Sequence, residues 1–273
     1  MVRRQRIPGL DGHSNEQEIM KIDKIIISTN DSLDYIQFLP IICKAWKKLL
    51  GDQVSIVLGY ATNKPESQWE WMREYAEVTR FWNPHIPSAN LAKVSRLLLA
   101  SEFYDKNCLL SDIDMLPMQA KYFSDISDLL EPGNIIFYSS DAYPWQGDRY
   151  PICYILANGY TYREIVNPQD LSTEELLDIW SCKHVDGKDD VSKSPFSDES
   201  LLRWMLIRWG QKNRMNLRRR GWINNIALGR VDRSRWYINP EALHNGEYID
   251  AHLLRPMSQY QDQIRPLTDY LGI

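Results

Sequence analysis

The stretch SANLAKVSRLLLASEFYDKNCLLSDIDMLPM, residues 88–118, decides the fold of this chain of 273 residues. Near its centre, the short apolar run CLL at residues 108–110 is typical of a buried strand that enters a sheet. Asp112, Ile113 and Asp114 follow, and Pro117 ends the strand soon afterwards. On an extended chain the two carboxylates point to one side, and Ile113 points to the other, into the core. Carboxylates at the carboxyl end of a strand lie where open α/β sheets bind their ligands.

The spacing of Asp112 and Asp114 indicates a site for a divalent metal ion. Two like charges this close repel each other unless a cation lies between them. Hard oxygen ligands suit Mg²⁺ or Mn²⁺, and either ion can also hold a substrate diphosphate. The alternative is a solvated turn between strand and loop, because Asp-x-Asp alone is a common sequence.

A helix is expected before this strand, from residue 89 to about residue 101, with Ser88 as its N-cap. Lys93 and Arg96 are three residues apart, so they are neighbours on one side of that helix. The apolar face of the helix consists of Leu91, Val94, Leu97 and Leu98.

A helix with an arginine, a short link, an apolar strand and Asp-x-Asp, in this order, resembles the metal-dependent glycosyltransferases of the GT-A fold. The segment VSRLLLASEFYDKNCLLSDIDMLPM is most similar to the glycogenin and galactosyltransferase type, family 8. In those enzymes the two aspartates bind Mn²⁺ and the donor nucleotide, and the helix arginine contacts the donor sugar. The resemblance, which is one of motifs, implies these roles for Asp112, Asp114 and Arg96.

The order of the predicted elements indicates an α/β fold. Strands are expected at residues 24–29, 54–60, 78–81 and 108–110, and helices at 33–50, 66–76 and 89–101. This alternation favours a mostly parallel central sheet flanked by helices, and the resemblance implies its GT-A, Rossmann-like form. Later strands are expected at 134–140, 152–157, 222–228 and 236–239, and later helices at 124–130, 160–166, 172–180 and 199–209.

We expect residues 1–20 to form a flexible lead-in. Residues 21–273 would form a single GT-A catalytic domain. Within it, residues 21–118 would bind the nucleotide and residues 119–273 would bind the acceptor.

Asn30 and Asp31 form a polar turn at the carboxyl end of the first predicted strand. The resemblance implies that this turn contacts the nucleotide base. The alternative is a helix cap, since Asp31 or Ser32 could cap the helix that follows. Asn158 closes a later apolar run and resembles the asparagine that the family places near the reacting centre; the alternative is an ordinary turn.

Asp198 and Glu199 open a strongly periodic helix at residues 199–209. Capping by Ser197 or Asp198 explains one acidic residue, because negative charge suits a helix N-terminus. The resembled family has Asp-Gln-Asp at this point, which implies catalytic roles for Asp198 and Glu199, although glutamate replaces the glutamine. In an inverting transferase such a residue deprotonates the acceptor hydroxyl. In a retaining transferase such a residue supports the positively charged, oxocarbenium-like centre of the sugar. The sequence therefore leaves open whether the reaction inverts or retains the configuration.

His252 and Arg255 resemble the His…Lys-Pro element of the same family, with a shorter spacing and arginine in place of lysine. The resemblance implies that His252 completes the metal site of Asp112 and Asp114, and that Arg255 holds the donor diphosphate. Arginine can clamp phosphate oxygens bidentately, and imidazole suits Mn²⁺ better than Mg²⁺. The alternative for His252 is an ordinary hydrogen-bonded side chain.

Composition excludes a general attraction to nucleic acid or to anionic membranes, because 32 basic and 36 acidic residues give a net charge of −4. A local basic cluster at Arg214, Arg218, Arg219 and Arg220 is either a solvated face or a contact for an acidic acceptor or membrane headgroups. The four cysteines form no C-x-x-C pair, which favours reduced thiols and a cytosolic compartment. No apolar signal-peptide region or transmembrane segment is found, so we expect a cytoplasmic protein, in the host cytoplasm if viral.

The sequence therefore predicts a hexosyl- or pentosyltransferase that moves sugar from a nucleotide-diphosphate sugar, such as a UDP-sugar, to a glycan, a glycoconjugate or another hydroxyl acceptor. Mn²⁺ or Mg²⁺ would be its cofactor. One alternative is a metal-dependent phosphoesterase or nucleotidyltransferase, against which the lack of a P-loop counts. Another is a non-catalytic carbohydrate-binding protein, which explains 10 Trp and 15 Tyr but not the paired aspartates.

Overall fold

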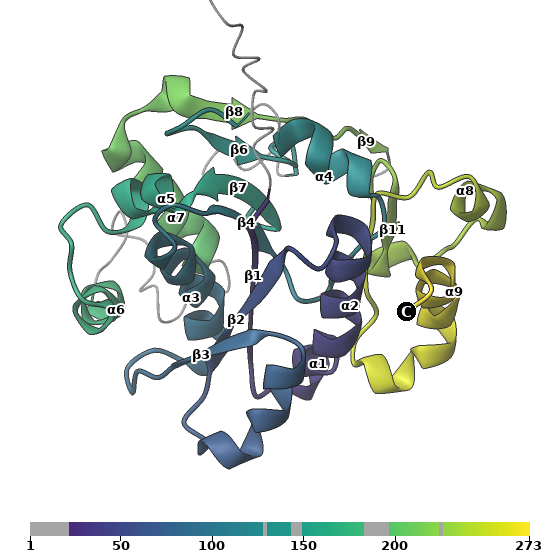
Figure 1. Ribbon diagram of the computed structural model, residues 1–273, viewed down its shortest axis with the longest axis horizontal. Coiled ribbons are helices and arrows are strands. Elements are labelled where there is room, and N and C mark those ends of the chain that lie inside the picture. The colour runs from purple at the N-terminus through teal and green to yellow at the C-terminus, as the bar shows by residue number, and fades with distance from the viewer. Residues whose placement is uncertain (1–21, 128–129, 143–148, 183–196, 224–225) are drawn as a thin grey trace, which may run out of the picture.

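The computed structural model describes residues 22–127, 130–142, 149–182, 197–223 and 226–273 (Figure 1). The lead-in expected at residues 1–20 lies outside these residues. The centre of the described part is a sheet of seven strands in the order β3-β2-β1-β4-β7-β6-β8. The strands are β1 (Lys24–Asn30), β2 (Ser55–Ala61), β3 (Glu77–Phe81), β4 (Asn107–Ser111), β6 (Ile135–Phe137), β7 (Tyr154–Asn158) and β8 (Met215–Leu217).

Only β7, among these described strands, runs against its neighbours. It pairs antiparallel with both β4 and β6, whereas β1, β2, β3 and β4 pair in parallel, as do β6 and β8. The prediction of an α/β fold with a mostly parallel central sheet is therefore confirmed.

Helices cover both faces of this sheet (Figure 1). Because side chains alternate along a strand, Ile25 and Ile27 of β1 pack into one hydrophobic cluster and Ile26 into the other. The first cluster includes α2 (Leu39–Leu50), α4 (Ala120–Ser127) and α9 (Gln261–Leu271). The second includes α3 (Ser88–Glu102), α5 (Gly159–Val166), α6 (Thr173–Cys182) and α7 (Ser197–Trp209).

A second sheet, in the order β11-β12-β5, joins distant parts of the chain. Its strands are β11 (Arg230–Asp232), β12 (Asp250–His252) and β5 (Met115–Pro117). Because β12 pairs with β5, His252 lies opposite Met115, and the Leu253 amide donates to the Asp114 carbonyl oxygen at 2.9 Å. The small sheet thus brings the C-terminal part of the chain beside the Asp-x-Asp turn.

The remaining described α-helices and strands are short. They are α1 (Leu33–Ile36), α8 (Pro240–His244) and the antiparallel pair of β9 (Trp222–Ile223) and β10 (Ile226–Ala227). Single 3₁₀ turns also occur, among them Lys212–Arg214, Arg233–Arg235 and Met257–Gln259. The helix expected at 33–50 is divided into α1 and α2, with Pro40 in the first turn of α2, where a proline is tolerated.

Three local predictions are wrong. Residues 66–76 form two 3₁₀ turns, Glu66–Gln68 and Glu70–Glu74, in place of one α-helix. Residues 236–239 form no strand. Ser88 is the first residue of α3 and does not cap it; its hydroxyl accepts a hydrogen bond from Asn30 Nδ2 at 3.1 Å.

The cysteines with described side chains, Cys43, Cys108 and Cys153, are free thiols. Burial raises the pKa of the Cys43 thiol to about 12, so it stays protonated and unreactive at neutral pH. None of the helices in the described ranges is both long and apolar enough to span a bilayer.

Candidate functional site

A cleft of about 380 Å³ opens at the carboxyl ends of β1 and β4. Its volume is within the range of small-molecule sites. Most of the residues predicted for the site line it, namely Asn30, Arg96, Asp112, Asp114, Asp198, Glu199 and His252. They come from the end of β1, from α3, from the turn after β4, from the start of α7 and from the end of β12.

The Asp-x-Asp segment is a turn and does not run extended, because the Met115 amide donates to the Asp112 carbonyl oxygen at 3.2 Å. Both carboxylates nevertheless line the cleft, and Ile113 between them is buried in the core, as expected. Their exposure differs: 32% of the Asp112 side chain is exposed, compared with 8% of that of Asp114. The inner carboxylate, Asp114, therefore depends more on protein partners to compensate its charge.

Arg96 joins two acidic residues from different segments. Its side chain is buried, with Nη1 hydrogen-bonded to Asp112 and Nη2 at 2.7 Å from Asp198 Oδ2. Burial lowers the pKa of Arg96, but the two carboxylates outweigh it and hold the pKa above its ordinary value. The guanidinium is thus a fixed positive charge that connects the turn after β4 to the start of α7.

Asp198 and Glu199 lie in the first turn of α7, and both are buried. The described contacts of Asp198 are not those of an N-cap, because its carboxylate is directed to Arg96. Two acidic residues at the wall of a cleft are more than helix capping requires, and their position suits proton transfer to or from a bound molecule.

Three cationic side chains surround Asp114. Arg233 Nη1 lies 2.7 Å from Asp114 Oδ2, His252 Nε2 lies 3.5 Å from it and Arg255 Nε 3.9 Å. Burial raises the pKa of Asp114, but His252 and Arg233 outweigh it, so the net shift is downward. Asp114 therefore stays ionised in its buried position.

His252 also contacts Asp232, with 3.6 Å between Nδ1 and Oδ2. Burial lowers the pKa of His252, but the contacts with Asp114 and Asp232 outweigh it and raise the pKa to about 8. Arg255 stacks on the ring of Tyr35 at 4.5 Å, and Tyr35 lines the cleft. The surroundings of Asp114 are thus rich in donors for an anionic group.

The donor set agrees with the expected Mn²⁺ in its chemistry, since carboxylate oxygens and an imidazole line one cleft. Asp114 and His252 are already neighbours. Across the described residues, however, no group of three or more His, Cys, Asp and Glu is close enough to hold a metal ion. Arg96 and Arg233 each contact one oxygen of these carboxylates, Oδ1 of Asp112 and Oδ2 of Asp114.

Three predicted residues, Asp31, Asn158 and Arg255, do not line this cleft. Asp31 lines a neighbouring hollow with Trp82 and Ser88 and accepts hydrogen bonds from the hydroxyls of Tyr60 and Thr62, while Ser32 caps α1. Asn158 caps α5 and pairs with Asn107, at the opposite end of β4 from Asp112. The prediction that Asn158 lies near the reacting centre is wrong, because β7 is antiparallel.

Arg233 is the main site residue that the sequence prediction missed. It follows β11, whose pairing with β12 brings it to the cleft, and no local pattern marks it. Its neighbour Asp232 gives a weak signal, since an aspartate followed by serine two residues later is typical of a turn, and Ser234 donates to it.

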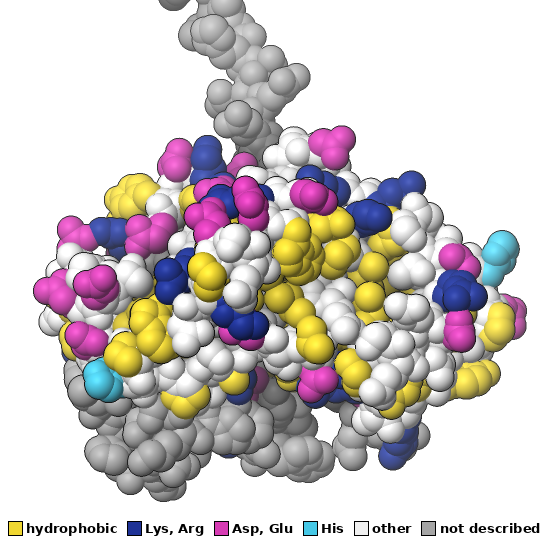
Figure 2. Space-filling model, turned by 90° about the horizontal axis from the view of Figure 1, so that it is seen from below, with side chains coloured by type: hydrophobic (Ala, Val, Ile, Leu, Met, Phe, Trp, Pro, Cys, Tyr) yellow, Lys and Arg dark blue, Asp and Glu magenta, His cyan; other side chains and the backbone are white. Residues whose placement is uncertain are grey.

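The predicted basic cluster does not form one solvated face. Arg220 is buried against Asp250, at 2.6 Å between Nη1 and Oδ2, and Arg214 pairs with Glu164 at 3.2 Å. On the face drawn in Figure 2, acidic and basic side chains are interspersed.

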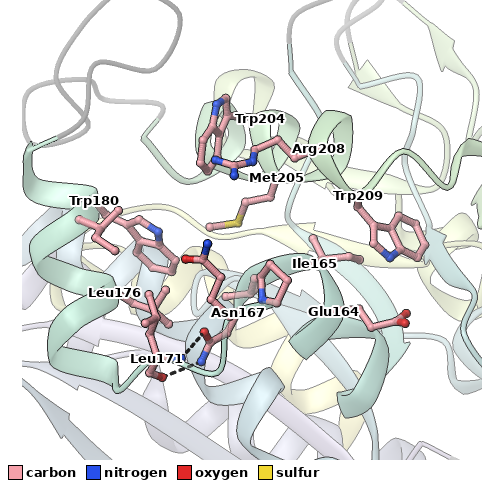
Figure 3. Close-up of a pocket in the computed structure, with 14 residues that line it drawn as sticks. Glu164, Ile165, Asn167, Leu171, Leu176, Trp180, Trp204, Met205, Arg208 and Trp209 are labelled. Carbon is pink, nitrogen blue, oxygen red and sulfur yellow. Dashed lines mark hydrogen bonds between the residues drawn. The ribbon is translucent and has the colours of Figure 1, made fainter.

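A second cavity of about 390 Å³ lies among α5, α6 and α7 (Figure 3). Trp180 from α6 and Met205 from α7 line it, and Arg208 stacks on Trp204 at 4.4 Å. The Asn167 amide is already held by the backbone of Leu171. None of the predicted site residues lines this cavity, whose walls are mainly aromatic and aliphatic.

No family model and no curated protein matches the sequence. Among solved structures, the glycosyltransferase GlyE of Streptococcus pneumoniae TIGR4 matches with a TM-score of 0.44 and 14% identity, over 72% of this chain and 45% of that one. The chain thus spans less than half of the length of GlyE.

Two other solved structures are comparable in likeness. The mannosyltransferase PcManGT from Pyrobaculum calidifontis, in complex with GDP-Man and Mn²⁺, matches with a TM-score of 0.35 and 10% identity, over 54% of this chain and 46% of that one. A cytidylyltransferase from Leptospira borgpetersenii matches with a TM-score of 0.39 and 10% identity, over 73% of this chain and 76% of that one. The neighbours are thus glycosyltransferases and nucleotidyltransferases, and similarity this weak transfers no function, which must be inferred from the cleft.

Proposed function

We propose that this chain is a GT-A glycosyltransferase that transfers a sugar from a nucleotide-diphosphate sugar, most simply a UDP-sugar, to a hydroxyl group of a glycan or glycoconjugate. The observation that carries the proposal is that one cleft holds two kinds of charged group. Buried carboxylates of Asp198 and Glu199 line it, and cationic side chains surround Asp114, which also lines it. A sugar nucleotide needs both kinds of surface, since its diphosphate is anionic and its acceptor must lose a proton.

The diphosphate would lie against Arg233, His252 and Arg255. Two of these are arginines, whose planar donors match phosphate oxygens. Asn30 lines the cleft, and its amide contacts Ser88, which lines an adjoining hollow together with Asp31 and Trp82. This hollow would take the nucleoside. Residues 21–118 would then contribute most of the nucleotide site, and residues 119–273 the acceptor side.

The carboxylates of Asp112 and Asp114, with the imidazole of His252, would hold Mn²⁺ or Mg²⁺. When bound, the ion supplies Lewis-acid stabilisation of a departing diphosphate. The contacts of Asp114 with Arg233, His252 and Arg255 are all made by its Oδ2 atom. Hard oxygen donors with one imidazole favour Mn²⁺.

In the reaction, the bond between the anomeric carbon and the phosphate oxygen breaks, and a bond from that carbon to the acceptor oxygen forms. Arg96 would orient the sugar, because both of its terminal nitrogens are already fixed by Asp112 and Asp198. Asp198 or Glu199 would accept the proton of the acceptor hydroxyl in an inverting reaction. In a retaining reaction the same carboxylates would stabilise the positive charge on the sugar ring.

The test is product analysis after incubation with UDP-, GDP- and CDP-sugars and Mn²⁺, with the Glu199→Gln variant as a matched control. A freed nucleoside diphosphate, reduced in the variant, supports the proposal. A nucleoside monophosphate would instead indicate the phosphoesterase or nucleotidyltransferase alternative. Sugar binding that is independent of metal and without turnover would indicate the carbohydrate-binding alternative.

A further inference from the structure

The aromatic cavity among α5, α6 and α7 is as large as the cleft, with about 390 Å³ compared with about 380 Å³. Trp180, Trp204 and Trp209 contribute indole rings to its walls, and Figure 3 shows Trp180 of α6 and Trp209 of α7 on opposite sides in this view. A cavity of this size with aromatic walls and a few polar groups is typical of a binding site. The reaction proposed above gives this cavity no role.

Two of the three indoles are held in place by arginines. Arg208 stacks on the ring of Trp204 at 4.4 Å, and Arg214 stacks on that of Trp209 at 5.1 Å. A guanidinium is attracted to the face of an aromatic ring. Glu164 in turn holds Arg214, at 3.2 Å. The rings are thus oriented before a ligand binds, which lowers the entropic cost of binding.

The polar groups of the cavity indicate the chemistry of its ligand. Of the described residues that line it, Glu164 and Arg208 are charged, and Glu164 is already compensated by Arg214. Gln169 and Arg208 are exposed and available for hydrogen bonds at the wall. An aliphatic chain would use none of these polar groups, and a strongly charged ligand would meet little opposite charge.

A neutral sugar ring matches both parts of this surface. The C–H groups on one face of a pyranose carry partial positive charge, and the face of an aromatic ring is negative, so the two stack. The hydroxyls at the edge of the sugar ring remain free to hydrogen-bond with side chains such as Gln169 and Arg208.

Aromatic side chains continue beyond the cavity. The hydroxyl of Tyr160 donates to Glu164 at 2.9 Å, and the rings of Tyr160 and Tyr104 are in contact, with 5.1 Å between their centroids. These tyrosines are 40% and 55% exposed. Through Glu164 and Arg214 they are joined to Trp209. A row of exposed rings fits a chain of sugars better than a single sugar.

The position of this row separates it from the reacting groups. Helix α7 connects the two sites, since its first turn lines the cleft with Asp198 and Glu199 and its later turns line the cavity. The row leads away from the cleft, because Tyr160 follows Asn158 at the far end of β4. A sugar bound there would not touch the catalytic carboxylates.

We propose that the cavity and the tyrosines beyond it form a second carbohydrate-binding site, which holds a neutral oligosaccharide by stacking sugar rings on Trp204, Trp209 and Tyr160. The bound chain is a distant part of the acceptor glycan, and this identity of the chain rests on the proposed function. Binding itself needs neither a metal ion nor a nucleotide, because none of the residues predicted to hold them lines the cavity.

Glycan binding by the full chain, in EDTA and without nucleotide, tests this. The first probe is a printed array of neutral and acidic oligosaccharides, and we expect neutral chains of several sugars to be bound. Isothermal titration calorimetry with the best-bound oligosaccharide then compares variants. Trp204→Ala should weaken binding about tenfold, because one stacked ring is lost. Trp71→Ala is the matched control and should bind like the wild type, because Trp71 is an exposed tryptophan in the turn before β3, at the other end of the sheet from β8.

Tyr160→Ala removes an exposed ring, so it tests the row without disturbing the core, and it should also weaken binding about tenfold. Circular dichroism establishes that each variant is folded. The inference is overturned if the array shows no bound glycan or acidic glycans alone, or if Tyr160→Ala and a folded Trp204→Ala both keep full affinity. Saturable binding of palmitate in place of any glycan would also overturn it.

These outcomes are independent of the proposed function. If no glycan binds here but a nucleoside diphosphate is still released from a sugar nucleotide, the second site fails and the proposed function stands. If the glycan binds as expected but no sugar nucleotide is turned over, the proposed function fails and the binding site stands.

Discussion

Arg96 is the residue that connects the two acidic groups of the cleft. It is only 4% exposed, and it contacts Asp112 from the turn after β4 and Asp198 from α7. Lysine could not replace it, because a single ammonium group lacks the fork that reaches two carboxylates at once.

Arg96→Met should therefore lower the free energy of unfolding by about 3 kcal/mol or more, since it leaves a buried carboxylate without its partner. Urea denaturation followed by circular dichroism measures this. Arg73→Met is the control, because the Arg73–Glu66 pair is exposed and such pairs contribute about 0–1 kcal/mol. A loss in Arg96→Met no larger than in the control would contradict this structural role.

The small sheet of β11, β12 and β5 depends on one buried ion cluster. Asp250 of β12 is completely buried, and both Arg220 and Arg230 donate to its two oxygens. Burial raises the pKa of Asp250, but the two arginines outweigh it and hold the pKa far below the ordinary value. The charged form is thus strongly favoured in the folded chain.

Asp250→Asn should cost about 3–5 kcal/mol at pH 7, because two buried cations lose their counter-ion. The pKa of Asp250 is lower in the folded than in the unfolded state, so its stabilisation is complete above about pH 4 and is lost as the pH falls further. Urea denaturation of both proteins from pH 7 to pH 3 measures this. The difference in the free energy of unfolding between the wild type and Asp250→Asn should be constant down to about pH 4 and then shrink. A difference that grows in acid would contradict the assignment.

At the level of elements, the sequence predicted what local patterns determine. The strand at 24–29 and the helix at 89–101 follow from apolar periodicity, and both form. The position of Asn158 could not be predicted in this way, because apolar periodicity does not reveal the direction of a strand. A parallel β7 would have brought Asn158 to the cleft, whereas the observed antiparallel pairing with β4 carries it to the opposite edge.

In the site, too, residues marked by a local pattern could be predicted, and those placed by long-range strand pairing could not. Asp112 and Asp114 are only two residues apart in the sequence and could be predicted together. Arg233 reaches Asp114 only through the pairing of β11 with β12 and of β12 with β5, a long-range contact with no local signature. The contact of Asp31 with the nucleotide base stays a prediction: Tyr60 and Thr62 of a neighbouring segment donate to its carboxylate, and Asp31 lines the hollow proposed for the nucleoside.

At the scale of the whole molecule, the cleft is assembled from segments that range from Ser28 to His252. A ligand in it therefore binds only the folded chain and stabilises that chain as a unit.

UDP with Mn²⁺ at about 100 times the dissociation constant should add about 2.7 kcal/mol to the free energy of unfolding. For a chain of this size, that raises the melting temperature by about 5–10 °C. Differential scanning calorimetry measures the shift. Trp204→Ala, in the separate aromatic cavity, should keep it, and Asp114→Asn should reduce it, because Asp114 is the buried carboxylate of the cleft that three cationic side chains surround. An unchanged shift in Asp114→Asn would move the nucleotide site away from this cleft.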